Sequence, residues 1–141
     1  DLKLKVAEVL KQTGSKKAWV VSGFDGLDEL TITDKNYIVE LDNGKIKEFI
    51  LDPSKIGITK CKKSELIGNN PKENAKIILD ILSNKINGAK KDIVLYNCAA
   101  ALIIAGKTES ISSGVQIAND AIKSGSALNK LNNLIKISNN Q

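Results

Sequence analysis

The composition is most informative in what it lacks: the 141-residue sequence contains no histidine, no arginine and no methionine. Without an imidazole there is no ready proton shuttle near neutral pH and no general base for a serine or cysteine nucleophile. Without arginine there is no bidentate clamp for phosphate or carboxylate, so lysine can act only as a point charge. Self-contained triad chemistry is therefore not expected. Since the chain opens at Asp1 and has no methionine, we expect a fragment of a longer protein.

Cysteines and aromatic residues are scarce as well. Cys61 stands among lysines and Cys98 in an apolar stretch, with no spacing typical of a metal site or disulfide framework, so both are expected to be free thiols. The net charge of +5 comes wholly from lysines scattered along the chain. A nucleic-acid surface usually combines clustered basic residues with arginine and stacking aromatics. We therefore interpret the lysines as a solvated surface and do not expect a nucleic-acid partner.

Length and hydropathy indicate one domain. With 42% hydrophobic and 26% charged residues the chain can bury a core. The longest apolar stretch, Ile93 to Ala105, is interrupted by Asn97 and is shorter than the roughly 20 residues that span a bilayer. Residues 1–141 are therefore expected to form a single, partial α/β domain in the cytoplasm, with no membrane partner.

Hydrophobic spacing predicts a helix and three strands in the first part of the chain. Leu2 to Lys11 has apolar residues on one helical face, and Lys17 to Val21 is a short apolar run typical of a buried strand. Tyr37 to Leu41 and Lys45 to Leu51 flank Asp42-Asn43-Gly44, and Asn-Gly strongly favours a two-residue hairpin turn. These two strands should therefore pair antiparallel.

Four helices are predicted after the strands. Asn70 and Pro71 form a helix start, with Glu73 two residues later. The stretch 89–105 is apolar nearly all round, which indicates a helix enclosed by other elements, and its alanines permit close approach. The expected apolar stripes are Ala75, Ile78, Leu79 and Leu82 in the first helix, Ile111, Val115, Ala118 and Ile122 in the third, and Leu128, Leu131 and Ile135 in the fourth.

A short acidic turn follows the first predicted strand. It places Asp25, Asp28 and Glu29 directly after the apolar run 18–21. Hard cations such as Mg²⁺ take oxygen ligands and leave positions open for substrate phosphates, so carboxylates at a strand end suit a magnesium and phosphate site. Taken alone, the same residues are more typical of a solvated turn.

Several motifs, read in order along the chain, give it a family resemblance. They are Val20 to Glu29, Asp52-Pro53 with Ile56-Gly57, Leu66-Ile67-Gly68, Glu73-Asn74-Ala75, Asn97 with Ala99-Ala100 and Leu102, and Gly114-Val115 with Ala118. In this order they resemble the C-terminal portion of anthranilate phosphoribosyltransferases. The resemblance covers essentially all 141 residues. It implies the later part of a nucleoside phosphorylase/phosphoribosyltransferase-type C-terminal α/β domain, a mixed sheet with a β-hairpin and packed helices.

The resemblance also implies a function and a site. Members of this family join anthranilate to phosphoribosyl pyrophosphate in tryptophan biosynthesis, and the residues that match Asp28 and Glu29 bind magnesium associated with the pyrophosphate. No protein nucleophile is required, so no catalytic residue is predicted, and the substrate-binding residues stay open. The Gly-rich phosphate loop and the anthranilate arginine lie in an earlier, missing N-terminal portion, so the fragment alone should be inactive. The full-length enzyme is expected to be a homodimer.

The chain departs from the family pattern at two places, and two other functions stay open. Ser22 stands where histidine is usual, and Asn69-Asn70 where a Gly-Asp pair is usual. A non-catalytic paralogue could use the +5 charge for nucleic acid, and a pyrimidine-nucleoside phosphorylase would use phosphate as the attacking group. Asn97, a polar residue in an apolar helix, is expected to make a structural hydrogen bond rather than to contact substrate.

Overall fold

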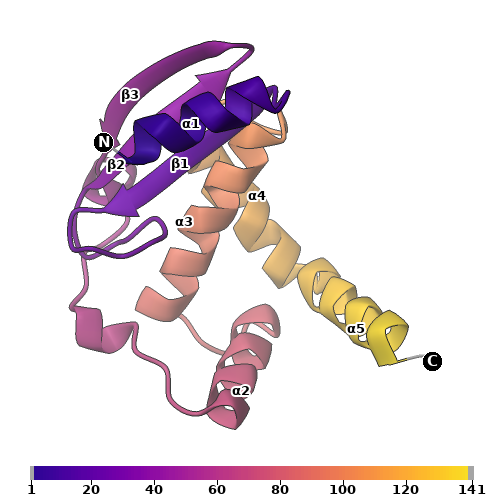
Figure 1. Ribbon diagram of the computed structural model, residues 1–141. Coiled ribbons are helices and arrows are strands. Elements are labelled where there is room, and N and C mark those ends of the chain that lie inside the picture. Colours follow the sequence, from indigo (N-terminus) through magenta and orange to yellow (C-terminus); the bar gives the residue numbers. More distant parts are fainter. Residues whose placement is uncertain (1, 140–141) are drawn as a thin grey trace.

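The computed structural model describes residues 2–139 and confirms the α/β class, with one three-stranded sheet and five α-helices in that range (Figure 1). A helix precedes the strands, two short 3₁₀ turns follow them, and four helices complete the described chain. The elements are α1 (Leu2–Gln12), β1 (Lys17–Gly23), β2 (Asn36–Asp42), β3 (Lys45–Leu51), η1 (Pro53–Ile56), η2 (Lys63–Glu65), α2 (Pro71–Leu82), α3 (Ala89–Ile104), α4 (Ile111–Lys123) and α5 (Ser126–Asn139).

The strands pair antiparallel in the order β1-β2-β3. The predicted hairpin between β2 and β3 is confirmed: Asn43 and Gly44 have φ of 47° and 82°, the left-handed values that a tight hairpin turn needs. β1 differs from the expected enclosed strand, because it lies at the sheet edge and most of its residues are only half-buried. Among residues 2–139 every strand pairing is antiparallel, so the mixed character implied by the resemblance is not seen in this range.

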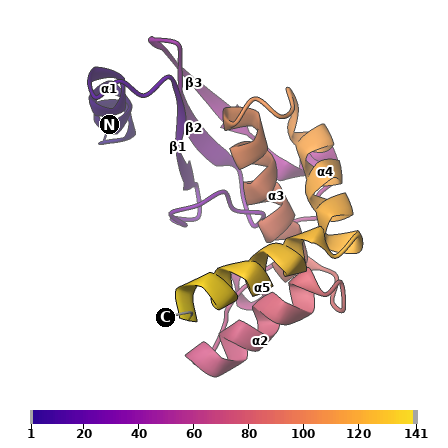
Figure 2. The ribbon, with the colours of Figure 1, turned by 90° about the vertical axis from the view of Figure 1, so that its right-hand side faces the viewer.

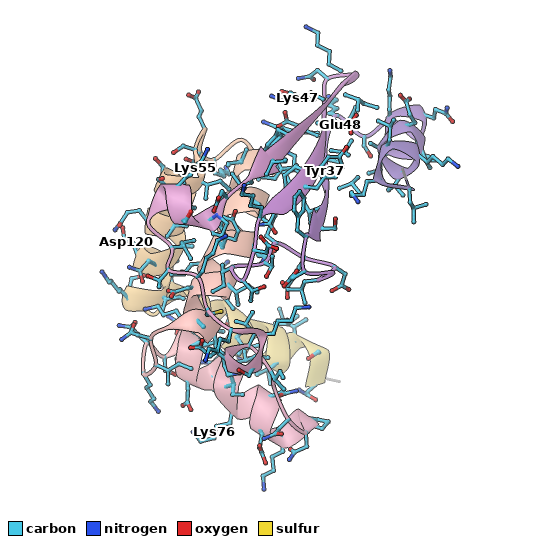
Figure 3. The ribbon with its side chains drawn as sticks, turned by 90° about the vertical axis from the view of Figure 1, so that its left-hand side faces the viewer. Tyr37, Lys47, Glu48, Lys55, Lys76 and Asp120 are labelled. Atoms are coloured by element: carbon cyan, nitrogen blue, oxygen red, sulfur yellow. The ribbon has the colours of Figure 1, made fainter. Side chains whose placement is uncertain are left out.

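Helices cover the two faces of the sheet unequally. Figure 2 shows α1 on one side of the strands, with α3 and α4 on the other. Tyr37 faces α1, where the Lys3 ammonium lies 5.0 Å from its ring centroid, and Figure 3 shows it on the α1 side of the sheet. The opposite face packs on α3 and forms the main core, whose buried members are Leu30, Ile32, Ile38, Ile58, Tyr96, Ala99, Ala100, Ile103 and Ile111.

α3 and α4 approach closely at one glycine. A Cβ built on Gly114 would lie 2.7 Å from the Cβ and 2.8 Å from the Cα of Ala99. The small side chains of α3 therefore permit the close approach that the sequence predicts. The predicted stripe of α4 is also confirmed, since Ile111, Ala118 and Ile122 are buried.

The start of α2 is as predicted, but its buried face is not. Asn70 caps the helix by accepting a hydrogen bond from the Glu73 amide at 3.0 Å. Ile81 is the residue buried in α2, whereas Ile78 and Leu79, both predicted to be buried, are 50% and 43% exposed. The neighbours of α2 are α3 and α5 rather than the sheet. The helix therefore packs against them with the face that carries Ile81.

α3 is enclosed on only part of its circumference. Cys98 is exposed, contrary to the expectation of a helix that is buried all round. Neither cysteine of the described chain is in a disulfide, as expected. None of the helices within residues 2–139 has the length and apolar character needed to cross a membrane.

Candidate functional site

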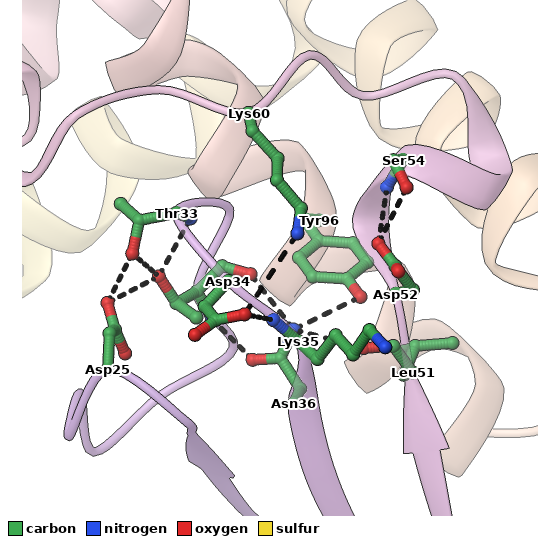
Figure 4. A network of polar contacts seen from close by, with 11 residues as sticks. Asp25, Thr33, Asp34, Lys35, Asn36, Leu51, Asp52, Ser54, Lys60 and Tyr96 are labelled. Carbon is green, nitrogen blue, oxygen red and sulfur yellow. Dashed lines mark hydrogen bonds and ion pairs between the residues drawn. The ribbon is translucent and has the colours of Figure 1, made fainter.

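The acidic turn connects the end of β1 to β2 and is tied together around Asp25. The Gly23 amide donates to the Leu27 carbonyl at 2.9 Å, which closes a tight loop around this carboxylate. Asp25 accepts hydrogen bonds from the Leu27 amide at 3.1 Å and from the Thr31 hydroxyl at 2.9 Å. It also accepts one from the Thr33 hydroxyl (Figure 4). Its two oxygens are therefore engaged within the loop.

The electrostatics of Asp25 agree with a structural role. Burial opposes its ionisation, but the hydrogen bonds from Thr33, Leu27 and Thr31, with the nearby Lys63 charge, outweigh burial and hold the pKa of Asp25 below its ordinary value. A carboxylate that is fixed in its charged form by three donors within the loop has little capacity left for a metal. Asp25 thus shapes the turn that carries the other two acids.

Gly23 is the residue that lets Asp25 fold back on the strand end. A Cβ at Gly23 would lie 2.2 Å from the Oδ1 atom of Asp25 and 2.7 Å from the Cγ2 atom of Thr31. Real side chains do not approach this closely, so any larger residue would have to push the carboxylate or the threonine away. The glycine is required here by close packing, not by an unusual φ.

Two asparagines, half-buried Asn97 and fully buried Asn36, fix the segment that follows the acids. Asn97 of α3 accepts from the Leu30 amide at 3.0 Å and donates to the Leu30 carbonyl at 2.9 Å. Asn36, at the start of β2, pairs in the same way with Thr31, the residue after Leu30. It accepts from the Thr31 amide at 2.7 Å and donates to the Thr31 carbonyl at 2.9 Å. Asn36 also reaches the hydroxyl of Tyr96 at 3.4 Å (Figure 4). The backbone next to the acidic pair is thus held from the sheet and from α3.

Asp28 and Glu29 lie between these two anchored parts of the loop, and both are exposed. Burial, followed by the charge of the adjacent Asp28 carboxylate, raises the pKa of Glu29 above its ordinary value. Two neighbouring carboxylates that repel each other are stabilised by a cation between them. Within residues 2–139 no group of three or more His, Cys, Asp or Glu side chains that could hold a metal ion is found.

A hollow of about 290 Å³ opens beside the same turn. Its wall includes Lys63, whose ammonium hydrogen-bonds to the Asp25 carbonyl. Asp28 and Glu29 are not part of this wall, so the structure brings the two predicted ligands together with each other but not with the hollow. The lining residues are Asp25, Gly26, Leu27, Lys63, Leu66 and Ile67.

Sequence reasoning overlooked the residues that support the site. Thr31, Thr33 and Asn36 all bond the loop, yet none was singled out. The closely spaced hydroxyls of Thr31 and Thr33 after an Asp-Gly turn are the signal that could have found them, because such side chains often bond nearby backbone and carboxylate groups. Ser22, the departure from the family pattern, is half-buried at the end of β1.

The chain belongs to the family described as "Glycosyl transferase family, a/b domain", whose model matches residues 1–128. Within that class its relatives are anthranilate phosphoribosyltransferases. The enzyme of Methanobrevibacter smithii is 43% identical over 134 residues, which cover 95% of this chain and 40% of the relative. The enzyme of a Thermoanaerobacter species is 44% identical over 131 residues, which cover 93% of this chain and 38% of the relative.

Solved structures agree with the sequence comparison. The Thermus thermophilus anthranilate phosphoribosyltransferase matches with a TM-score of 0.79 at 32% identity, over 89% of this chain and 36% of the other. The Saccharomyces cerevisiae enzyme in complex with PRPP and Mg matches with a TM-score of 0.85 at 28% identity, over 93% and 38%. The chain thus spans about 40% of the length of the relatives it matches.

Proposed function

We propose that this chain is the C-terminal α/β portion of a phosphoribosyltransferase that transfers the phosphoribosyl group of phosphoribosyl pyrophosphate to anthranilate. The observation that carries the proposal is the exposed Asp28 and Glu29 pair, which follows a strand in a chain that resembles such enzymes over 95% of its length. In this reaction the anthranilate amine attacks C1 of the ribose while the bond from C1 to the pyrophosphate oxygen breaks. No nucleophile from the protein is needed.

The carboxylate pair fits a magnesium site of the kind that is completed by substrate. Mg²⁺ usually keeps several waters and binds through one or two carboxylates together with substrate phosphates. Asp28 and Glu29 supply these two carboxylates. The pKa of Glu29 is raised, and a cation bound beside it would lower that pKa again. When bound, the ion would neutralise negative charge on the departing pyrophosphate. Asn97 and Asn36 hold the adjacent backbone, so the two carboxylates are presented from a rigid loop.

Surfaces of this chain favour a further portion of the same protein as its partner. Leu2, Val6 and Val9 of α1 are 74%, 39% and 56% exposed, and β1 pairs on one edge only within the described residues. Unpaired strand edges and exposed apolar stripes are usually covered in a complete protein. We propose that the rest of the protein, which the family resemblance places N-terminal to this chain, covers them. The expectations of a homodimer, a cytoplasmic location and a single domain over 1–141 stay predictions.

A chimera tests this proposal. Residues 1–141 would replace the matching 40% of the Methanobrevibacter smithii enzyme, and the loss of anthranilate fluorescence on adding phosphoribosyl pyrophosphate and Mg²⁺ would be followed. The chimera should be active, and Asp28→Asn and Glu29→Gln should each lower kcat/KM by about tenfold or more. Glu48→Gln, an exposed change on β3 (Figure 3), is the matched control and should have no effect.

Two outcomes would count against the proposal. A chimera that folds with the stability of the parent enzyme but forms no product would show that this chain does not supply the C-terminal part of the active site. Equal activity in the parent chimera and in the Asp28→Asn and Glu29→Gln variants would remove the role assigned to the carboxylate pair.

A further inference from the structure

Lys91, in the first turn of α3, is a charged residue buried inside the helical part of the molecule. Its exposed fraction is 5%. The ammonium donates to the Oδ1 atoms of Asn84 at 2.7 Å and Asn87 at 3.2 Å, both in the connection between α2 and α3. An ammonium has three donors, so these two amide oxygens leave one donor without an acceptor among the described residues.

The ammonium of Lys91 is not in a direct ion pair within the described residues, although the carboxylate of the adjacent Asp92 interacts with its charge. The other buried charged residue, Glu40, pairs with Lys47 at 2.7 Å and accepts from the Trp19 indole at 2.8 Å. Among residues 2–139 no carboxylate forms an ion pair with Lys91 within 4.0 Å. Burying a charge is costly unless it is paired, so an unpaired buried ammonium is a natural place for an anion to bind.

A polar pocket of about 410 Å³ lies against Lys91. The connection from α2 to α3 forms one wall, and α4 forms the facing wall; Figure 2 shows these segments near one another. Two lysines and four amide side chains border the space, whereas Asp92 is its one acidic group. The lining residues are Asn84, Asn87, Lys91, Asp92, Leu95, Val115, Gln116, Asn119 and Lys123.

Three of the four amide side chains of this pocket have donors that are not engaged elsewhere in the described chain; the exception is Gln116, whose NH₂ group donates to the Asp120 carboxylate at 2.9 and 3.0 Å. The amide groups of Asn84 and Asn87 turn their oxygens toward Lys91, which leaves their NH₂ groups free to donate elsewhere. Asn119 has no hydrogen bond from its side chain within the described chain, and Lys123 on the facing wall is exposed. Buried Lys91, exposed Lys123 and these amides therefore converge as donors on one space.

We propose that this pocket binds a small oxyanion, a phosphate or carboxylate group, held by Lys91 and Lys123 with the asparagine amides as further donors. The site is separate from the acidic turn. Successive α-helical residues turn by about 100°, so Lys91 and Leu95 lie on the side of α3 opposite Ile93 and Asn97. Because Asn97 faces the loop of Leu30, the oxyanion site does not rest on the proposed transferase function and can stand or fall without it.

Titration with inorganic phosphate tests the proposal on the 141-residue chain. Backbone amide resonances would be followed by NMR at constant ionic strength, with chloride as the exchanged anion. Saturable shifts should concentrate at Asn87, Lys91 and Asn119. Lys91→Gln should weaken binding by about tenfold, since one charge-assisted hydrogen bond is lost. Lys85→Gln, on the same connection and exposed, removes an equal charge and should leave affinity unchanged.

A second variant and a second probe complete the test. Lys123 is exposed, so Lys123→Gln should fold normally and still weaken binding several-fold, even if Lys91→Gln fails to fold. Acetate in place of phosphate tells a carboxylate site from a phosphate site, and saturation by either supports the proposal. Shifts that do not saturate with phosphate or acetate, or equal affinity in Lys123→Gln and Lys85→Gln, would overturn it.

Discussion

Asn97 pairs with both backbone polar groups of Leu30, accepting from its amide and donating to its carbonyl, although the two residues are 67 positions apart. The same side chain also donates to the Ile93 carbonyl at 3.0 Å within its own helix. One amide thus joins the middle of α3 to the residue that directly follows Glu29. This link makes the position of the acidic pair depend on the packing of α3 against the sheet.

Asn97→Ala should destabilise the protein and loosen the loop. Leu30 is 1% exposed, so its amide and carbonyl would lose their partner where water does not easily replace it. A buried polar group left without a partner costs about 1–3 kcal/mol in the free energy of unfolding. Urea denaturation would measure the loss, and Asn132→Ala on the exposed face of α5 is the control, with an expected change within about 0.5 kcal/mol. A similarly small change for Asn97→Ala would contradict the structural role.

Gly23→Ala should disturb the acidic turn. Its new methyl group would meet the Asp25 carboxylate at 2.2 Å and Thr31 at 2.7 Å, and overpacking of this kind costs about 1–3 kcal/mol. A double-mutant cycle with Asp25→Ala isolates the contact between the new methyl group and the Asp25 carboxylate. The penalty of Gly23→Ala should shrink when Asp25 is truncated, and additive effects of the two changes would show that the carboxylate is not the obstacle.

The stability of the chain should depend on pH through Asp25. Its pKa is lowered in the folded state, so ionised Asp25 contributes stability above its ordinary value of 3.8, and that contribution is lost as the pH falls through the folded pKa. Asp25→Asn should therefore be less stable than the parent at neutral pH, and the difference should vanish in strong acid. Urea midpoints measured across this range would check the sign, and a difference independent of pH would refute it.

The pKa of Glu29 is shifted in the opposite direction to that of Asp25. Its pKa is raised by burial and by Asp28, so Asp28→Asn should lower the pKa of Glu29 by removing one of these causes. Added Mg²⁺ should lower it too, and Mg²⁺ affinity should rise as the pH passes upward through that pKa, because the ion needs the deprotonated carboxylate. Carboxyl ¹³C NMR follows both effects directly. A Glu29 pKa that is unmoved by Mg²⁺ would speak against metal contact.

Signals within a few residues predicted most elements of the fold. The hairpin turn at Asn43 and Gly44 and the start of α2 at Asn70 depend on local backbone preferences, so the sequence alone is sufficient to find them. The prediction of which face of α2 is buried was wrong for a physical reason. Its apolar residues form two neighbouring stripes, through Ile78 and Leu79 and through Ile77 and Ile81, and helical periodicity does not decide which one meets a partner.

The two candidate ligands, Asp28 and Glu29, could be proposed from the sequence, but the residues that hold their loop could not. Asp28 and Glu29 are adjacent in the sequence and stand out as acids after a strand. The contacts of Asn97 to Leu30 and of Asn36 to Thr31 exist only once α3 and the sheet have packed, and the first joins residues 67 positions apart. Such pairings depend on tertiary structure, which periodicity and spacing do not encode.

The central claim is that Asp28 and Glu29 together bind magnesium that carries pyrophosphate. Carboxyl ¹³C NMR of the 141-residue chain, titrated with Mg²⁺ and pyrophosphate, tests it most directly. The Asp28 and Glu29 resonances should shift along one saturation curve, while Glu48 stays in place, and Asp28→Asn should weaken the response of Glu29 by about tenfold. Resonances of Asp28 and Glu29 that move no further than that of Glu48 would contradict the claim.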